Sequence, residues 1–219
     1  MKKIILKQIF LVNIVLSKTN IVVGQSLDSL QYLKEYTQLN EALKDPEHVY
    51  RLNLSNQTFK EFPSGLSQFK NLQYLSLRND HLTKISNEIG TLQKLRVLDL
   101  GGNDFSLLPK DFVKLENLEV LYLDDDKKLD LYKDFEILAL LPKLRVLHLE
   151  NDGIREVPSN IYSLMHLEDL YLSDNLLRIT PPQIKDMKNL KFLELHNNHL
   201  PTNLHLNQPY PASGLRIKF

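Results

Sequence analysis

Two short clusters of metal-ligating residue types stand out in the sequence. His196 and His199 are three positions apart, and residues 124–126 are three consecutive aspartates. Paired imidazole nitrogens suit Zn²⁺, and adjacent carboxylates suit a hard cation such as Ca²⁺. However, no carboxylate is arranged as an obvious third ligand for the histidines, and two lysines at 127–128 directly follow the aspartates. We therefore expect no metal site and no cofactor.

No motif for catalysis accompanies these clusters. The sequence has no nucleophile elbow, no phosphate-binding loop and no dinucleotide fingerprint, so we expect no enzymatic activity. It has no cysteine, which excludes disulfides and thiolate metal sites. The 27 basic residues equal the 27 acidic ones. A nucleic-acid-binding protein usually has a basic excess, so this balance argues against that class.

The residues that remain are positioned by a repeat. The pattern L-x-x-L-x-L-x-x-N-x-L occurs seven times, with five steps of 23 residues and one of 26 between the starts. The copies begin at Val49, Leu72, Leu95, Leu118, Leu144, Leu167 and Leu190. Apolar alternation at Leu98 and Leu100 predicts a short strand with one buried face. Phe105, Leu108 and Phe112 follow at helix-like spacing and predict a return segment on the opposite side.

This pattern resembles the leucine-rich repeat family over residues 49–200. The resemblance implies an α/β solenoid shaped as a curved horseshoe, with a parallel sheet on the concave side and helical or irregular segments on the convex side. The 23-residue form with a Leu-Pro pair resembles the repeats of Ras-binding scaffold proteins and of bacterial surface proteins. The fourth copy is three residues longer and lacks that pair, and its segment 132–141 is predicted to form a longer convex helix.

The ninth position of each repeat follows the predicted strand. In the family it is an asparagine whose amide both donates to and accepts from backbone groups of adjacent repeats. An ionised aspartate can only accept, so aspartates here predict a less completely satisfied set of hydrogen bonds. The seven residues are Gln57, Asp80, Asn103, Asp126, Asp152, Asn175 and Asn198.

The third, fifth and seventh positions of the repeats are expected on the concave surface, where this architecture usually binds. Register places Tyr122, His148 and Tyr171 side by side on consecutive strands, next to a valine stripe at 97, 120 and 146. Tyrosine is enriched in binding surfaces. We predict a partner-binding site with these three rings at its centre. Its expected acidic rim, suited to a partner with a basic patch, is Asp99, Asp124 and Glu150.

The two ends of the chain differ from the repeats. Residues 1–24 have a basic start, an apolar run and a small residue before Gln25, which resembles a signal peptide. The alternative is an ordinary amphipathic helix of a cytoplasmic protein, because Lys7, Gln8 and Asn13 interrupt the apolar run. The run is also too short and too interrupted to span a membrane. Residues 25–48 have leucines at helical spacing from Leu27 to Leu43 and are predicted to form a capping helix. Residues 201–219 are expected to cap the other end, with an edge strand over 215–219.

These features together predict a monomeric, non-catalytic protein-binding module. We expect it to be bacterial and exported to the periplasm, the cell surface or the medium, with a cytoplasmic location as the alternative. Two other functions stay open. One is a carbohydrate or peptidoglycan binder that uses Tyr122 and Tyr171 as stacking platforms. The other is a recognition subunit of a separate enzyme.

Overall fold

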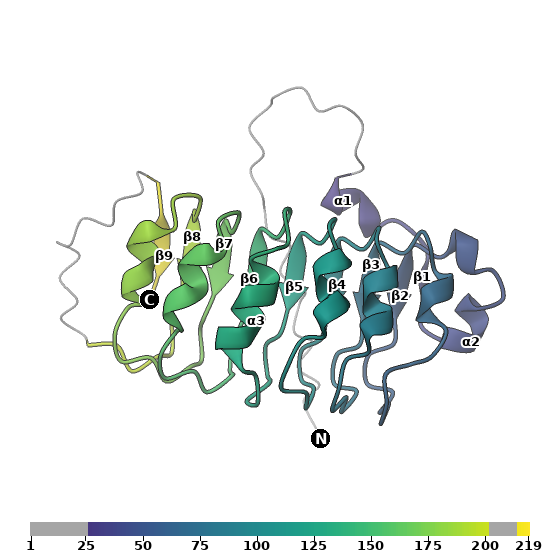
Figure 1. Cartoon of the computed structure of the whole chain (residues 1–219), viewed down its shortest axis with the longest axis horizontal. Coiled ribbons are helices and arrows are strands. Elements are labelled where there is room, and N and C mark those ends of the chain that lie inside the picture. Colours follow the sequence, from purple (N-terminus) through teal and green to yellow (C-terminus); the bar gives the residue numbers. More distant parts are fainter. Residues whose placement is uncertain (1–25, 202–213) are drawn as a thin grey trace, which may run out of the picture.

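A computed structural model describes residues 26–201 and 214–219, and its described part is a coil of repeats built on one sheet (Figure 1). The nine strands are all parallel and follow one another in sequence order. They are β1 (Glu35–Tyr36), β2 (Arg51–Asn53), β3 (Tyr74–Ser76), β4 (Val97–Asp99), β5 (Val120–Tyr122), β6 (Val146–His148), β7 (Asp169–Tyr171), β8 (Phe192–Glu194) and β9 (Arg216–Lys218). The predicted leucine-rich repeat solenoid is therefore confirmed.

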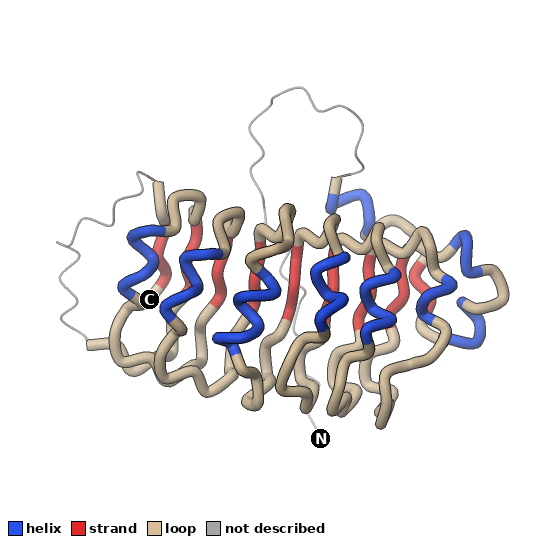
Figure 2. Tube along the Cα trace, in the orientation of Figure 1, coloured by secondary structure: helices blue, strands red, loops and turns tan. Residues whose placement is uncertain are grey.

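Helical segments connect the strands and cover the opposite side of the sheet, as Figure 2 shows in blue. Most are single turns of 3-10 helix, because each return path of the repeat is short. They are η1 (Pro46–His48), η2 (Leu66–Gln68), η3 (Asn87–Thr91), η4 (Lys110–Lys114), η5 (Ser159–Ser163) and η6 (Pro182–Asp186). The longer fourth repeat instead contains the α-helix α3 (Leu131–Leu138), as its sequence predicts.

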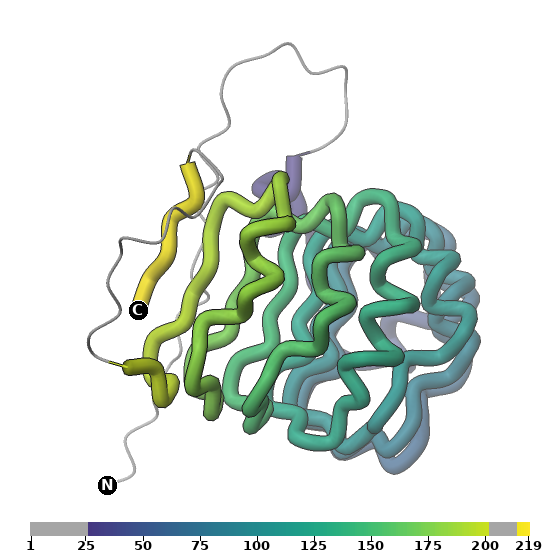
Figure 3. Tube along the Cα trace, turned by 60° about the vertical axis from the view of Figure 1, so that its left-hand side comes forward, coloured from purple at the N-terminus to yellow at the C-terminus, as the bar shows by residue number. Residues whose placement is uncertain are grey.

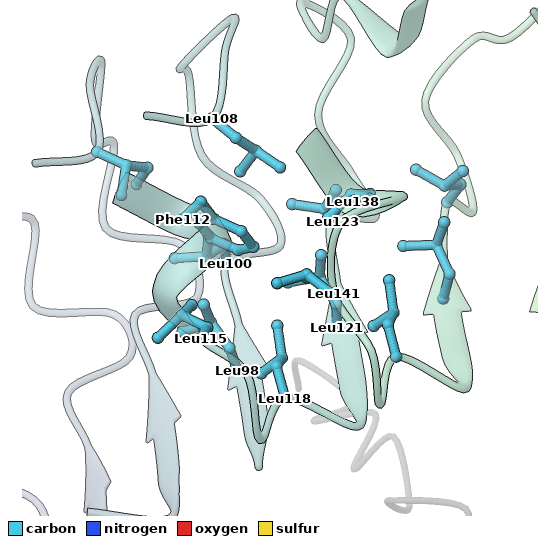
Figure 4. Packing of buried hydrophobic residues seen from close by; sticks show 14 of the residues in the cluster. Leu98, Leu100, Leu108, Phe112, Leu115, Leu118, Leu121, Leu123, Leu138 and Leu141 are labelled. Carbon is cyan, nitrogen blue, oxygen red and sulfur yellow. The ribbon is translucent and has the colours of Figure 1, made fainter. Parts of the chain in front are cut away.

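Leucines from the strands fill the space between the sheet and these helical segments. The central leucine of each of the seven repeat strands is fully buried; these residues are Leu52, Leu75, Leu98, Leu121, Leu147, Leu170 and Leu193. In Figure 4, Leu98 and Leu121 lie on neighbouring strands, with Phe112 and Leu138 from the helical side completing the core. Burying one such side chain contributes about 1.5–3 kcal/mol. Successive turns stack on one another (Figure 3), so the core runs without interruption from repeat to repeat.

In the turn after each repeat strand, the residue at the eighth position of the repeat adopts the left-handed backbone conformation. These residues have φ between 53° and 67° and are Asn56, Asn79, Gly102, Asp125, Asn151, Asp174 and Asn197. Asparagine, aspartate and glycine tolerate this conformation best. The choice of residue type at this position therefore follows from the sharp turn by which the chain leaves the sheet.

The ninth-position residues form an asparagine ladder beneath these turns. Asn103 Nδ2 donates to the carbonyls of Leu77 (2.8 Å) and Leu100 (2.7 Å), and its Oδ1 accepts from the Leu82 amide at 3.0 Å. Asn175 makes the equivalent bonds: its Nδ2 donates to the carbonyls of Leu149 and Leu172, and its Oδ1 accepts from the Ile154 amide. Each asparagine thus joins two neighbouring turns through both ends of its amide.

The aspartates in this ladder satisfy only one of their two oxygens. Asp80, Asp126 and Asp152 each accept backbone N–H groups through Oδ1, while Oδ2 is buried without a hydrogen-bond partner among the described residues. Burial raises the pKa of Asp126 to about 6 and that of Asp152 to about 9. The prediction of a less satisfied ladder is confirmed, because one oxygen of each aspartate is buried without a partner among the described residues.

The predicted single helix over residues 27–43 is wrong. The segment forms two short helices, α1 (Leu27–Leu30) and α2 (Leu39–Ala42), with β1 between them. β1 pairs with β2, and Arg51 holds the segment by donating to the Leu30 carbonyl at 2.9 Å and pairing with Glu35. Pairing satisfies backbone groups that an open edge of β2 would leave exposed, and this outweighs the local helical periodicity.

The other end is capped by β9, which pairs in parallel with β8 and confirms the predicted final strand. Ile217 is half-buried against the core, while Arg216 and Lys218 are exposed. The predicted signal peptide at 1–24 and the segment 202–213 lie outside the described residues. Within the ranges 26–201 and 214–219, no helix has the length and apolar character needed to cross a membrane.

Candidate functional site

Four rings from consecutive strands lie in a line across the concave face, and we call them the aromatic row: Tyr122, His148, Tyr171 and Phe192. Tyr122 and His148 stack with centroids 4.2 Å apart, and His148 and Tyr171 stack at 4.1 Å. Tyr171 and Phe192 are 5.4 Å apart and tilted by 56°. The three predicted central residues are thus brought together, and Phe192 on β8 continues the row.

The strand spacing explains the stacking. Parallel strands lie about 4.8 Å apart, close to the separation of two stacked rings. His148 is opposite Tyr122 on one side and Tyr171 on the other, in the same register. Rings at the same register position therefore stack face to face, and both faces of His148 are covered.

His148 is the most enclosed member of the aromatic row. It is 9% exposed, and its Nδ1 lies 3.0 Å and 3.2 Å from the two carboxylate oxygens of Glu150. Its Nε2 is buried and has no hydrogen-bond partner among the described residues. Glu150, predicted as part of the rim, thus orients the central ring of the row.

The other two rim residues belong to an ion-pair network centred on Arg78. Arg78 Nε donates to both oxygens of Asp99 at 3.1 Å and 3.0 Å. Its Nη2 pairs with Asp124 at 2.5 Å, and its Nη1 with Asp125 at 3.3 Å. The guanidinium therefore extends across two strands and neutralises much of the negative charge expected at this end of the rim.

Gly101 makes this reach possible. A Cβ atom at position 101 would overlap the guanidinium of Arg78, and one at position 102 would overlap Oδ1 of Asn79. The Gly-Gly pair is thus where Arg78 passes over the neighbouring strand end. The two consecutive glycines can be read from the sequence, but the reason for them is the close approach of side chains from the preceding repeat.

Burial perturbs the ionisable groups of this face. It raises the pKa of Asp124, although the hydrogen bond and charge of Arg78 act in the opposite direction. It also raises the pKa of the Tyr171 hydroxyl to about 12. The tyrosine therefore stays neutral at physiological pH and offers a hydroxyl for hydrogen bonding.

A second set of charges lies at the position just before each of the strands β4 to β8. Glu119 accepts from Arg96 (2.6 Å) and Arg145 (2.7 Å), and Glu168 pairs with Lys191 at 2.9 Å. A polar pocket of about 460 Å³ adjoins these residues and includes Glu119, Arg145 and Glu168 in its lining. Because its charges are already paired with one another, this pocket is a weaker candidate site than the aromatic row.

In the fold, the members of each cluster of potential metal ligands lie in different environments. His196 lies 3.0 Å from Glu194, while His199 is exposed. Of the three aspartates, 124 and 125 bind Arg78 and Asp126 is buried in the asparagine ladder. Within the part of the chain that the structure describes, no group of three or more potential ligands could hold a metal ion.

Sequence reasoning missed two residues of this face. Arg78 is not among the predicted site residues, because the reach of its side chain to Asp124 cannot be read from register. Asp169 lies next to Tyr171 on the same face of β7 and is not among the predicted rim residues. Its lack of a partner becomes visible only once the pairs of the other carboxylates are known.

Known proteins are similar to this chain in sequence pattern and in fold. Family profiles described as leucine-rich repeat region and leucine rich repeat match residues 49–141 and 142–200. A leucine-rich repeat protein of Leptospira interrogans is 30% identical, with a TM-score of 0.51 over 76% of this chain and 54% of that one. A search of curated protein sequences finds no significant match.

Two internalins of Listeria monocytogenes share the fold alone. Internalin inlF is 22% identical with a TM-score of 0.61, covering 78% of this chain and 48% of its own. Internalin C2 is 20% identical with a TM-score of 0.57, covering 80% and 82%. This chain thus spans about half the length of the Leptospira protein and of inlF. The repeat, the parallel sheet and the matched profiles together make this chain a member of the leucine-rich repeat family.

Proposed function

We propose that this chain is a non-catalytic protein-binding module that uses the concave face of its sheet. The aromatic row supports this most directly, because its rings form a continuous strip over four strands. Tyrosine supplies contact area and a hydroxyl at low entropic cost. Leucine-rich repeat domains typically mediate protein binding, and their concave surface is the usual site. Tyr122, His148 and Tyr171 form the centre of the proposed interface.

The rim residues have a supporting role in this proposal. Asp99 and Asp124 are held by Arg78, and Glu150 faces His148, so none of them is a free charge. Paired charges at the edge of an interface mainly influence association rate and salt dependence. We therefore assign the binding free energy to the rings and the approach of the partner to the rim.

Binding of a carbohydrate by aromatic stacking is less well supported. A sugar ring packs on a free aromatic face. Both faces of His148 are covered by its neighbours, and the outer side of Tyr171 is directed toward Phe192. The row therefore presents mainly ring edges, which suit a protein surface better than a sugar.

Site-specific photo-crosslinking tests the proposal. Benzoylphenylalanine is placed at Phe192 in the full chain, and in a second variant at Tyr162, which is 55% exposed on η5. After irradiation in the native host, mass spectrometry identifies the adducts. We expect one protein adduct from position 192 that is missing from position 162. Adducts from position 162 alone would place the interface on the convex side and refute the proposal.

Titration of that partner then measures the contribution of each ring. Tyr122→Ala and Tyr171→Ala are expected to weaken binding at least tenfold, because truncated aromatic anchors typically lose ~2 kcal/mol or more. Tyr162→Ala is the matched control and should bind as the wild type does. Folding of each variant is checked by circular dichroism.

We also propose that residues 1–24 direct export from a bacterial cell. The support is the order of a basic start, an apolar run and a small residue at Gly24. The expected mature protein begins near Gln25. N-terminal sequencing of protein from the native host tests this, and an intact Met1 in the cytoplasmic fraction would favour the cytoplasmic alternative.

We further propose that the chain is monomeric. The two terminal strands are short, with two residues in β1 and three in β9, and a short edge strand offers little backbone for pairing with another copy. Analytical ultracentrifugation at two protein concentrations that differ tenfold should show a single species. Its mass should be 25.5 kDa, reduced by the mass of any segment that has been cleaved off.

A further inference from the structure

The carboxylates of the concave face differ in whether they have a partner. Five of them face a basic group: Glu35 faces Arg51, Asp99 and Asp124 face Arg78, Glu150 faces His148, and Glu194 faces Lys218. Asp169 on β7 is different, because its carboxylate has no hydrogen bond or ion pair with any described residue. Among the described strand residues of the concave face, Asp169 is therefore a carboxylate that the fold leaves unpaired.

The basic residues around Asp169 are engaged elsewhere. Arg145 pairs with Glu119 at 2.7 Å, and Lys191 pairs with Glu168 at 2.9 Å. Arg216 lies over the ring of Phe192, 5.6 Å from its centroid. Burial, followed by the charge of Glu168, raises the pKa of Asp169. The positive charges of Lys191, Arg216 and Arg145 offset this rise only in part. The carboxylate is thus partly removed from water without a compensating contact.

The neighbours of Asp169 on the same face are apolar or aromatic. Register places it between Val146 on β6 and Phe192 on β8, and Tyr171 is two residues along the same strand. Val146 is buried, while Phe192 and Tyr171 are half-buried. These surroundings suit a long basic side chain, because its methylene stem can pack on the apolar groups while its charged head pairs with the carboxylate.

We infer that Asp169 is the anchoring point for one lysine or arginine side chain of the protein partner. The stem of that side chain packs along the half-buried rings of Tyr171 and Phe192, and its charged head forms a hydrogen-bonded ion pair with the Asp169 carboxylate. The inference rests on the proposed function and narrows the partner to a protein that presents an accessible basic side chain beside an apolar segment. Pairing removes the cost of a desolvated charge, so it favours the bound state.

Selection from a random dodecapeptide library tests the inference without a known partner. Phage displaying the library are selected on the full-length chain, and binders are counter-screened on Tyr171→Ala to retain those that use the concave face. We expect one lysine or arginine to recur at a fixed position. Synthetic peptides are then titrated by fluorescence anisotropy, together with versions in which norleucine replaces that lysine or citrulline replaces that arginine.

A double-mutant cycle assigns the contact to Asp169. Asp169→Asn should weaken binding of the basic peptide at least tenfold, and the neutral peptide should bind wild type and variant equally. Asp186→Asn is the matched control, because Asp186 is exposed on η6 at the convex side. Asp169→Asn should fold normally, since the native carboxylate has no partner to lose, and thermal unfolding verifies this.

Other outcomes separate the two claims. Concave-face peptides without a recurring basic residue, or binding that changes less than twofold in Asp169→Asn, would overturn the inference and leave the proposed function intact. Peptides whose binding depends only on convex residues, or failure to obtain any binder that Tyr171→Ala affects, would count against both.

Discussion

Single buried carboxyl groups determine how this protein should respond to pH. In the asparagine ladder, an aspartate oxygen occupies the place where asparagine directs its Nδ2 toward backbone carbonyls, as Asn103 and Asn175 do. An unsatisfied buried group costs about 1–3 kcal/mol. Protonation relieves this cost, because a carboxylic acid can donate a hydrogen bond.

Asp152→Asn should stabilise the protein at neutral and basic pH. Burial raises the pKa of Asp152 from 3.8 to about 9, so between about pH 4 and pH 9 the folded chain holds a proton that the unfolded chain has released. The stability that this group contributes is complete below pH 4 and is lost as the pH rises toward 9. We expect a gain of about 1–3 kcal/mol at pH 8 and a smaller one at pH 5.

Urea unfolding at the two pH values measures this difference. Asp186→Asn makes the same chemical change at an exposed position and should leave stability within about 0.5 kcal/mol of wild type at both. Equal effects of Asp152→Asn at pH 5 and pH 8 would show that the carboxyl does not titrate in this range.

Arg78→Met should destabilise the fold most at neutral pH. The substitution leaves Asp99 and Asp124 close together without their cation. Because Arg78 retains 25% side-chain exposure, we expect about 1–2 kcal/mol, below the ~3–5 kcal/mol of a fully buried pair. The loss should shrink near pH 4, because burial raises the pKa of Asp124 and its carboxylate is then protonated first. Urea unfolding at pH 7 and pH 4 tests this, with the exposed Arg155→Met as control.

At the scale of secondary-structure elements, α3 is attached to the preceding repeat through a buried aspartate. The buried face of α3 comprises Leu131, Asp134, Phe135 and Leu138. Asp134 is fully buried, and its Oδ1 accepts from the Leu108 amide at 2.9 Å. A polar residue thus occupies one position of an otherwise apolar face because it satisfies the backbone of the neighbouring convex segment.

Asp134→Ala should therefore destabilise the protein by about 1–3 kcal/mol, since it leaves the Leu108 amide without its acceptor. Asp134→Asn retains an acceptor oxygen. Because burial raises the pKa of Asp134 to about 7, the asparagine variant should be more stable than wild type at pH 8. Thermal unfolding and hydrogen exchange of the Leu108 amide measure both effects. Glu136→Ala, on the exposed side of α3, is the control, and an equal loss there would refute the assignment.

At the scale of the whole molecule, each repeat contacts mainly its neighbours. The extent of the sheet that a substitution destabilises should therefore depend on the position of its repeat along the solenoid. Leu121→Ala removes a fully buried side chain from the central strand β5 and should cost about 2–5 kcal/mol. Ile217→Asp alters only the half-buried terminal strand β9. We expect the first to reduce hydrogen-exchange protection throughout the sheet and the second to reduce it only in β8 and β9.

Hydrogen exchange read by mass spectrometry distinguishes these patterns. Leu107→Ala, at a residue 42% exposed on the convex side, controls for loss of a leucine as such. If Ile217→Asp lowered protection in β2 and β3 as much as in β8, the coil would unfold as one cooperative unit instead of repeat by repeat.

The period of the sequence by itself determined the parallel sheet, the register of its strands and the burial of one leucine per strand. It also determined that Tyr122, His148 and Tyr171 are neighbours, because residues one repeat apart occupy equivalent places on adjacent strands. A tandem repeat converts sequence spacing directly into spatial order. This is why the centre of the candidate site could be predicted.

Only the tertiary structure decided which charges are paired and how the first edge is closed. Arg78 reaches a carboxylate two strands away over Gly101, and Asp169 is left alone among apolar neighbours. β1 replaces part of the predicted helix because its backbone completes the sheet. Register places a side chain on a face, but its rotamer and partner depend on distances among several repeats, which one period cannot specify.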